Sequence, residues 1–266
     1  MIYLQNGDSL PSVAACQILL NRHLPSAQIL DVDGDFGRLT EAAVKAFQRS
    51  KSLSDDGVIG TNTWRELTNG VNIQIVDYVD TYDDSLEVME EAFLRRHGGT
   101  NIESPKYCFI NVRTIYDGIR AACAVKPVVL LRFYGHGNSG FIQVNGSLHY
   151  MDINAVDTSE FDSFLISLKP YFASYGSIEF HSCRTGRGRD GRNFLNRVAS
   201  NTGVPATAGI NDQLAAWAEN DAYSIEPLRW KRRNVRFEGP KRTAYPGGSF
   251  ENWIANVPEA NMSFAP

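Results

Sequence analysis

A repeated Asp-Gly turn near the start of the chain constrains the fold more than any other feature. The run DGDFGRLT begins at Asp33, and a degenerate copy, DGVIGTNT, begins at Asp56, 23 residues later. In each copy the first glycine suits a position of positive φ, one apolar residue enters the core, and a second glycine permits close backbone approach. The closing threonine is expected to cap the helix that follows. The repeat therefore predicts two equivalent turns that open helices.

Apolar residues at helical spacing surround these turns. Residues 12–21 and 40–48 each gather their apolar side chains on one face, and a shorter helix is expected over residues 61–67. Trp64, in this third helix, is assigned to the core rather than to a binding surface. Three short helices around two tight turns are the expected plan of the first seventy residues.

This plan resembles the three-helix peptidoglycan-binding module of bacterial wall hydrolases over about residues 2–70. The motifs G-D-S, V-x-x-x-Q-x-x-L, D-G-x-F-G-x-x-T, A-V-x-x-F-Q and D-G-x-x-G-x-x-T-W recur here nearly slot by slot. The resemblance implies a peptidoglycan-binding domain at residues 1–70, with peptidoglycan as its partner. Because most motif residues serve turns and core, the better candidates for wall contacts are polar residues on the exposed turns: Asp35, Arg38 and Asn62.

From residue 73 to 266 the pattern changes to strands that alternate with helices. Strands are expected at residues 73–79, 128–134, 177–181 and 204–208, and helices at 85–96, 115–124, 161–172 and 191–199. The dipeptide Asn145-Gly146 predicts a hairpin of residues 141–144 and 148–151. Such alternation indicates an α/β domain of three layers with a mainly parallel sheet.

Two reactive side chains follow buried strands in this second region. His136 comes after the strand at 128–134, and Cys183 comes after the strand at 177–181, 47 residues further on. Chemistry in open α/β sheets gathers beyond the carboxyl ends of the strands. The spacing and the run H-S-C-R-T-G resemble caspase-like cysteine peptidases, the group of caspases, legumain and gingipain, and their bacterial relatives. The likeness covers about residues 73–215.

The resemblance implies a role for each residue at these strand ends. Cys183 would be the nucleophile, with its thiolate favoured by Arg184, Arg187 or the start of the next helix. His136 would transfer protons, and the backbone N–H groups of Gly137 and Cys183 would form the oxyanion hole. His181 is an alternative base, since residues two apart on a strand share a face. Arg184 and Arg187 either bind an acidic group of the substrate or form a solvated turn.

Charge and hydropathy argue against nucleic acid and a lipid bilayer as partners of this chain. The net charge of −4 gives no basic excess for nucleic acid, and no apolar run approaches the roughly 20 residues of a membrane span. No zinc-ligand spacing is present, so neither a metal nor another cofactor is expected.

Cys16, Cys108 and Cys123 are expected to be buried thiols, and a Cys108–Cys123 disulfide is left open as an alternative. No cleavable signal is visible, so delivery to the periplasm or wall is expected by another route.

Two alternative functions follow from these motifs. In the first, the chain is a wall-targeted cysteine hydrolase that cuts an amide of the stem peptide or of a periplasmic protein. A phage lysin (endolysin) or an antibacterial effector toxin would act in this way, the latter with secretion machinery and an immunity protein as partners. In the second, the caspase-like domain has no active thiol, and the chain is a binding or structural protein.

Overall fold

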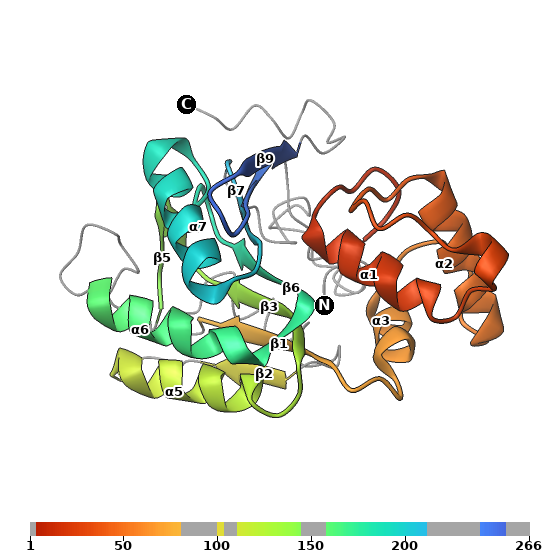
Figure 1. Cartoon of the computed structure of the whole chain (residues 1–266), viewed down its shortest axis with the longest axis horizontal. Coiled ribbons are helices and arrows are strands. Elements are labelled where there is room, and N and C mark those ends of the chain that lie inside the picture. The colour runs from red at the N-terminus through yellow and green to blue at the C-terminus, as the bar shows by residue number, and fades with distance from the viewer. Residues whose placement is uncertain (1–3, 81–99, 104–110, 145–157, 212–239, 254–266) are drawn as a thin grey trace, which may run out of the picture.

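The computed structural model describes residues 4–80, 100–103, 111–144, 158–211 and 240–253. Within these ranges, a small helical unit at the N-terminus lies beside a larger sheet, and further helices cover the other side of that sheet (Figure 1). Mixed α/β architecture with a mostly parallel sheet is therefore confirmed. The expected helix at 85–96 and strand at 148–151 lie outside the described residues.

The N-terminal unit contains the three expected helices, α1 (Pro11–Asn21), α2 (Arg38–Ser50) and α3 (Thr61–Thr68), and one turn of 3-10 helix at Ser26–Gln28. Their apolar faces enclose one core, in which Trp64 is buried as expected. The other members of this core include Leu10, Val13, Cys16, Leu19, Phe36, Val44, Phe47, Ile59 and Leu67. Burial of this set, at about 25 cal/mol per Å² of apolar surface, holds the short helices together.

A buried glutamine organises the first Asp-Gly turn. Gln17 Nε2 donates to Asp33 Oδ1 at 2.8 Å and to Thr40 Oγ1 at 3.2 Å, and Gln17 Oε1 accepts from Gly34 N at 3.0 Å. Gly34 has φ +74°, as the turn requires. The bond from Gln17 also lowers the pKa of Asp33. The turn is thereby tied to the middle of α1.

The second turn repeats this network atom for atom. Gln48 Nε2 donates to Asp56 Oδ1 at 2.8 Å and to Thr63 Oγ1 at 3.1 Å, and Gln48 Oε1 accepts from Gly57 N at 3.0 Å. The expectation that the closing threonines cap the helices is wrong in both copies. The N-caps are Gly37 and Gly60 without side-chain bonds, and the threonine hydroxyls contact the glutamines and the turn carbonyls instead.

Among the described residues, seven strands form the large sheet. In spatial order they are β2 (Thr100–Glu103), β1 (Gln74–Val79), β3 (Val128–Tyr134), β6 (Phe172–His181), β7 (Ala206–Gly209), β8 (Lys241–Ala244) and β9 (Phe250–Trp253). The first five run parallel, and β8 and β9 continue the sheet antiparallel. A separate two-stranded ribbon consists of β4 (Gly137–Asn138) and β5 (Phe141–Ile142).

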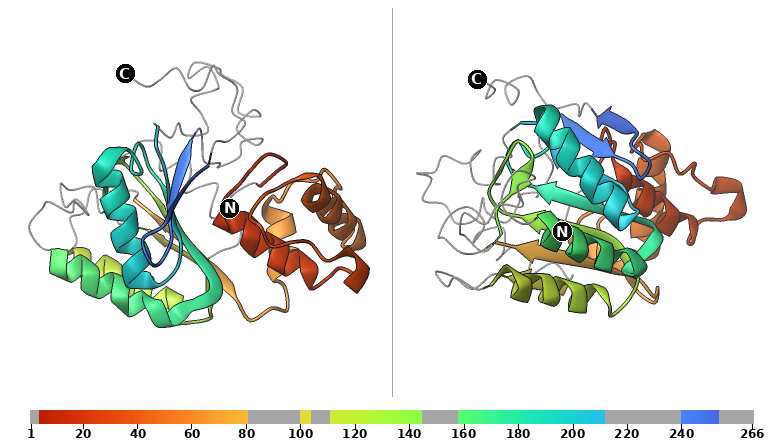
Figure 2. Two further views of the ribbon diagram at one scale, coloured as in Figure 1. Left: turned by 45° about the horizontal axis from the view of Figure 1, so that its top comes forward. Right: turned by 60° about the vertical axis from the view of Figure 1, so that its left-hand side comes forward.

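Helices α5 (Val112–Cys123), α6 (Thr158–Leu168) and α7 (Gly188–Thr202) cover one face of the sheet. The left view of Figure 2 shows the sheet between these helices and the N-terminal unit. Beneath the helices lies a second core, which includes Tyr78, Leu131, Phe133, Phe180, Phe194 and Val198. On the opposite face Ile75, Val129 and Leu130 join the core of the N-terminal unit, so the two units share apolar contacts.

Several local expectations need correction. Phe141 and Ile142 pair with Gly137 and Asn138 through a tight turn that was not predicted. The expected hairpin across Asn145-Gly146 extends outside the described residues and stays a prediction. Helix α6 ends at Leu168 and strand β6 begins at Phe172, whereas the helix was expected to reach residue 172 and the strand to begin at residue 177. Strands β8 and β9 were not predicted. Strand β8 pairs with β7, more than thirty residues earlier in the chain, and β9 pairs with β8; periodicity along the sequence does not reveal such pairing.

The cysteines have two environments. Cys16 and Cys123 are buried thiols, and burial raises the pKa of both, that of Cys123 to about 12. A Cys108–Cys123 disulfide is therefore not formed; Cys108 itself lies outside the described residues. Cys183 is also a thiol and is only partly buried.

Candidate functional site

The candidate site lies where strands β3 and β6 end. Tyr134 and His181 are the last residues of these neighbouring parallel strands, they are register partners, and their rings stack at 4.7 Å. The loops that follow begin with Gly135 and Ser182, so they leave the same edge of the sheet side by side. This is the carboxyl edge, at which the sequence predicted the reactive residues to meet.

The two loops are in direct contact. A Cβ added to Gly137 would lie 2.6 Å from Thr185 Oγ1 and 2.8 Å from Ser182 Cβ, closer than real Cβ contacts. Ser139 Oγ donates to the carbonyl of Arg187 at 2.6 Å, and Gly140 N donates to the carbonyl of Thr185 at 3.1 Å. The segment that carries His136 is thus fixed against the segment that carries Cys183.

The backbone next to Cys183 has an unusual conformation. Arg184, which follows the thiol, has φ +58°, and Ser52 is the other non-glycine residue with positive φ among those described. Such a conformation costs of order 1–3 kcal/mol and is found mostly where function requires it. The Arg184 amide donates to the carbonyl of Asn211 at 2.9 Å, which holds the turn in place.

The two histidines near the thiol differ in exposure. His136 is exposed, whereas the side chain of His181 is 4% exposed and has Nε2 3.1 Å from Glu179 Oε2. Burial lowers the pKa of His181, against the opposing effect of the Glu179 carboxylate. His181 is therefore packed against the sheet face, while the imidazole of His136 is accessible to a substrate.

The arginines of the Cys183 loop have separate positions. Arg184 and Arg187 are half-buried, and Arg189 and Arg192 are exposed. A residue that the sequence did not single out, Arg242 of β8, donates from Nη1 to the carbonyls of Gly186 and Gly188 at 2.6 and 3.1 Å. These bonds attach the loop to the antiparallel part of the sheet. No local pattern pointed to this contact, because its partners are more than fifty residues apart.

A row of polar side chains crosses the sheet on the face opposite the helices. Asp77, Arg132 and Glu179 are register partners on β1, β3 and β6, and Thr207 and Thr243 continue the row on β7 and β8. All are buried. The row reaches the candidate site through Glu179 and its contact with His181. In the sequence, this row could have been suspected from the single Asp, Arg or Glu that interrupts each of the strands β1, β3 and β6.

An ion pair joins the first two members of this row, on β1 and β3. Arg132 donates from Nε and Nη2 to the two carboxylate oxygens of Asp77, at 2.6 and 2.7 Å. Burial by itself would lower the pKa of Arg132, but the Asp77 carboxylate outweighs burial, so the pKa rises above its ordinary value. Arg132 Nη1 and Glu179 Oε1 have no hydrogen-bond partner among the described residues.

The expected wall contacts lie on the outside of the N-terminal unit. Asp35, Arg38 and Asn62 are exposed, at the starts of α2 and α3. Asp35 Oδ1 accepts from Ser9 Oγ at 2.6 Å, and Asn62 Oδ1 lies 3.4 Å from Nη1 of Arg65. All three are accessible to a large ligand, on equivalent turns of the repeat.

Comparison with known families decides the nature of this unit. Residues 9–67 match the family model described as "Putative peptidoglycan binding domain". The helical unit is a peptidoglycan-binding module. A solved structure of a peptidoglycan-binding protein from Clostridioides difficile, in complex with glutamine hydroxamate, is similar at 37% identity. That match covers 24% of this chain and 39% of the other, with a TM-score of 0.23.

The peptidoglycan-binding module packs directly on the sheet. Helix α1 lies next to β6, and Nη2 of Arg22 donates to the hydroxyl of Tyr175 at 3.3 Å. No helix within the described ranges has the length and apolar character needed to cross a membrane. Nor do the described residues include a group of three or more His, Cys, Asp or Glu side chains arranged to hold a metal ion.

Proposed function

We propose that the chain is a cell-wall-targeted cysteine hydrolase. Its substrate is an amide bond, either in the stem peptide of peptidoglycan or in a periplasmic protein. The observation that carries the proposal is the contact between the loops of His136 and Cys183 at one edge of a parallel sheet, with Gly137 against Ser182. The peptidoglycan-binding module would hold the hydrolase at the wall.

The chemistry needs a thiolate, a proton carrier and donors for an oxyanion. The sulfur of Cys183 attacks the scissile carbonyl carbon, while the backbone N–H groups of Gly137 and Cys183 bind the oxygen that becomes negative. His136 accepts the thiol proton and gives it to the leaving amine as the C–N bond breaks. Water then attacks the thioester with help from the same imidazole, which releases the acid and restores the thiol.

Three features support these roles. Cys183 is partly exposed, whereas Cys16 and Cys123 are buried thiols whose raised pKa values make them inert. His136 is exposed, whereas His181 is packed between Glu179 and Tyr134. Gly137 has no side chain, so its backbone lies directly against Ser182 and Thr185 of the Cys183 loop. Arg184 and Arg187 remain candidates for contact with an acidic group of the substrate.

The biological setting follows from this pairing of module and hydrolase. A phage lysin and an injected antibacterial effector both cut wall or periplasmic targets, and an effector would also meet secretion machinery and an immunity protein. Asp35, Arg38 and Asn62 are the proposed contacts with peptidoglycan. Either setting requires the same site.

One experiment separates a hydrolase from a purely binding protein. Wild-type protein is incubated with purified sacculi and with periplasmic proteins, and new amines are detected by mass spectrometry. Cys183→Ala and His136→Ala should abolish their appearance, and the matched thiol control Cys123→Ala should retain it. If wild type releases no new amines, or if Cys183→Ala releases as many as wild type, the hydrolase proposal fails and peptidoglycan binding alone remains.

A further inference from the structure

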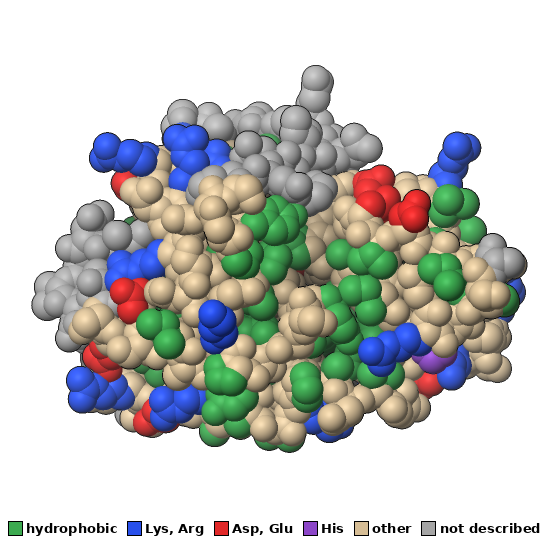
Figure 3. All heavy atoms as spheres, in the orientation of Figure 1, with side chains coloured by type: hydrophobic (Ala, Val, Ile, Leu, Met, Phe, Trp, Pro, Cys, Tyr) green, Lys and Arg blue, Asp and Glu red, His purple; other side chains and the backbone are tan. Residues whose placement is uncertain are grey.

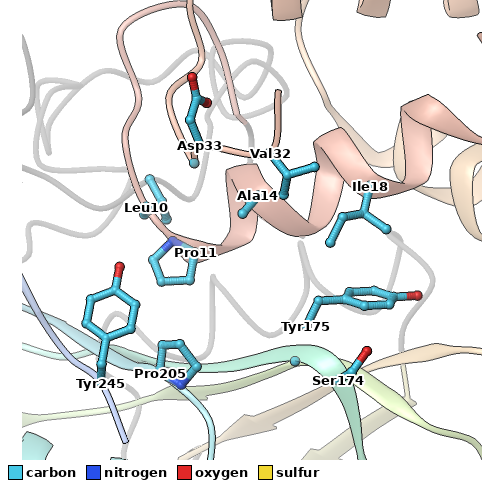
Figure 4. Close-up of a pocket in the computed structure, with 12 residues that line it drawn as sticks. Leu10, Pro11, Ala14, Ile18, Val32, Asp33, Ser174, Tyr175, Pro205 and Tyr245 are labelled. Atoms are coloured by element: carbon cyan, nitrogen blue, oxygen red, sulfur yellow. The ribbon is translucent and has the colours of Figure 1, made fainter. Parts of the chain in front are cut away.

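A cleft of about 270 Å³ lies between the peptidoglycan-binding module and the sheet. Figure 3 shows hydrophobic side chains gathered along the boundary between the two units. The module supplies one wall of the cleft, in which Leu10, Pro11, Ala14, Ile18 and Val32 present apolar side chains. Figure 4 shows the opposite wall, where Tyr245 and Tyr175 stand apart with Pro205 between them, and Ser174 lies below the ring of Tyr175.

We infer that this cleft binds the glycan strand of peptidoglycan, so that the sheet domain completes a saccharide site begun by the module. The inference rests on the proposed function, because it takes the wall as the ligand of the chain. It adds Tyr175 and Tyr245 to the wall-binding residues. These two belong to the hydrolase domain and lie far along the chain from Asp35, Arg38 and Asn62.

The lining matches the chemistry of an amino sugar. A pyranose ring has a face of C–H groups and a rim of hydroxyls, so it fits an aromatic ring that ends in a hydroxyl. The acetamido methyl group suits the apolar wall that the module supplies, where Val32, just before the first Asp-Gly turn, is 48% exposed and available for contact. The size of the cleft, just below the usual range of roughly 300–1,000 Å³ for ligand sites, suits a sugar ring rather than a folded peptide.

Charge favours the glycan over the stem peptide. The stem peptide carries carboxylates and an amine, whereas the glycan backbone with its amidated lactyl groups is neutral. Among the described residues that line the cleft, Asp33 alone is charged, and its carboxylate is bound by Gln17 and points away from the cleft in Figure 4. A charged peptide would lose its hydration in this cleft without gaining an ion pair.

The orientation of Tyr175 is set before any ligand binds. Its hydroxyl accepts a hydrogen bond from Arg22, which comes from the module side of the boundary. A tyrosine held in this way loses little rotamer freedom when a sugar stacks on it. One glycan strand in the cleft would therefore contact both units at once.

The test uses the full chain and two measurements. Affinity for tetra-N-acetylchitotetraose is measured by calorimetry, and binding to purified sacculi is measured by co-sedimentation. Tyr175→Ala and Tyr245→Ala should each weaken tetrasaccharide binding roughly tenfold. Ala14→Phe, which fills the cleft without removing an aromatic ring, should do the same. The control Val125→Ala removes an exposed apolar side chain away from the cleft and should bind as wild type.

The outcomes separate this inference from the proposed function. If wild type binds sacculi and all three cleft variants keep wild-type affinity for both ligands, the inference is overturned and wall targeting stands. If the variants lose binding to sacculi but keep wild-type affinity for the tetrasaccharide, the cleft binds the stem peptide and the glycan assignment is wrong. If wild type binds neither ligand, wall targeting fails together with the inference. Thermal unfolding of each variant shows whether a loss of binding comes from misfolding. If Tyr175→Ala or Tyr245→Ala does not fold, the binding result of Ala14→Phe decides the test.

Discussion

The rings of Tyr134 and His181 stack 4.7 Å apart at the paired last residues of β3 and β6. This contact places the origins of the two candidate catalytic loops at one level of the sheet. Each loop then needs only a few residues to bring its reactive side chain beyond the edge. The proposed reaction depends on this alignment.

Gly137 is the point of closest approach between the loops, so Gly137→Ala should separate them. The new Cβ would overlap Thr185 Oγ1 and Ser182 Cβ, at 2.6 and 2.8 Å. We expect a destabilisation of about 1–3 kcal/mol and loss of amide hydrolysis. Urea unfolding and product release measure the two effects. In the control Gly37→Ala the added Cβ meets nothing closer than 3.7 Å, and hydrolysis should persist. Wild-type hydrolysis by Gly137→Ala would contradict the described contact.

The buried pair of Asp77 and Arg132 should be sensitive to loss of one partner. Asp77→Asn removes the charge that compensates the guanidinium, and we expect a loss of about 3–5 kcal/mol in the free energy of unfolding. Asp117, which pairs with Arg120 on the exposed surface of α5, offers a matched control. Asp117→Asn should change stability by about 0.5 kcal/mol or less. Urea denaturation measures both changes in the free energy of unfolding. Similar changes for Asp77→Asn and Asp117→Asn would contradict the buried ion pair between Asp77 and Arg132.

His181 should make stability depend on pH. Burial lowers its pKa in the folded protein below the ordinary value of 6.5, so the unfolded chain binds the extra proton between these two values. The free energy of unfolding should therefore fall as the pH drops below about 6.5, by at most about 1.4 kcal/mol per pH unit for this one group. The decline should end at the folded-state pKa.

Urea unfolding between pH 7.5 and pH 5 checks this dependence. His181→Gln should flatten the curve in that window, while His23→Gln, which removes an exposed histidine, should retain most of the slope. A wild-type curve that rises toward acid pH would mean that His181 is charged in the folded state.

Local patterns predicted the elements of the fold well. Sequence patterns located α1, α2, α3, α5, α7, β1 and β3 within a few residues. Each helix gathers its apolar residues on one face, and the two strands are short runs of buried, mostly apolar residues. The meeting of the His136 and Cys183 loops followed from a general property of parallel sheets, because their carboxyl ends share an edge. Both inferences needed only the alternation of strands and helices along the chain, and not the order of the strands in the sheet.

Contacts between distant parts of the chain were not predictable in the same way. The glutamines Gln17 and Gln48 stood in the recognised motifs, but their bonds to the turns cross 16 and 8 residues and depend on tertiary packing. The polar row from Asp77 to Glu179 depends on strand register. Arg242 contacts the Cys183 loop from β8, a strand that the sequence patterns did not predict. The cleft between the units depends on how they pack.

The alkylation rate of Cys183 tests the pairing of thiol and imidazole most directly. The protein is treated with iodoacetamide at pH 6, and the modified peptide is quantified by mass spectrometry. We predict rapid alkylation of Cys183 in wild type, at least about tenfold slower alkylation in His136→Gln, and an unchanged rate in His23→Gln. Equal rates in wild type and His136→Gln would contradict the proposed pairing, because the imidazole would then have no influence on the sulfur.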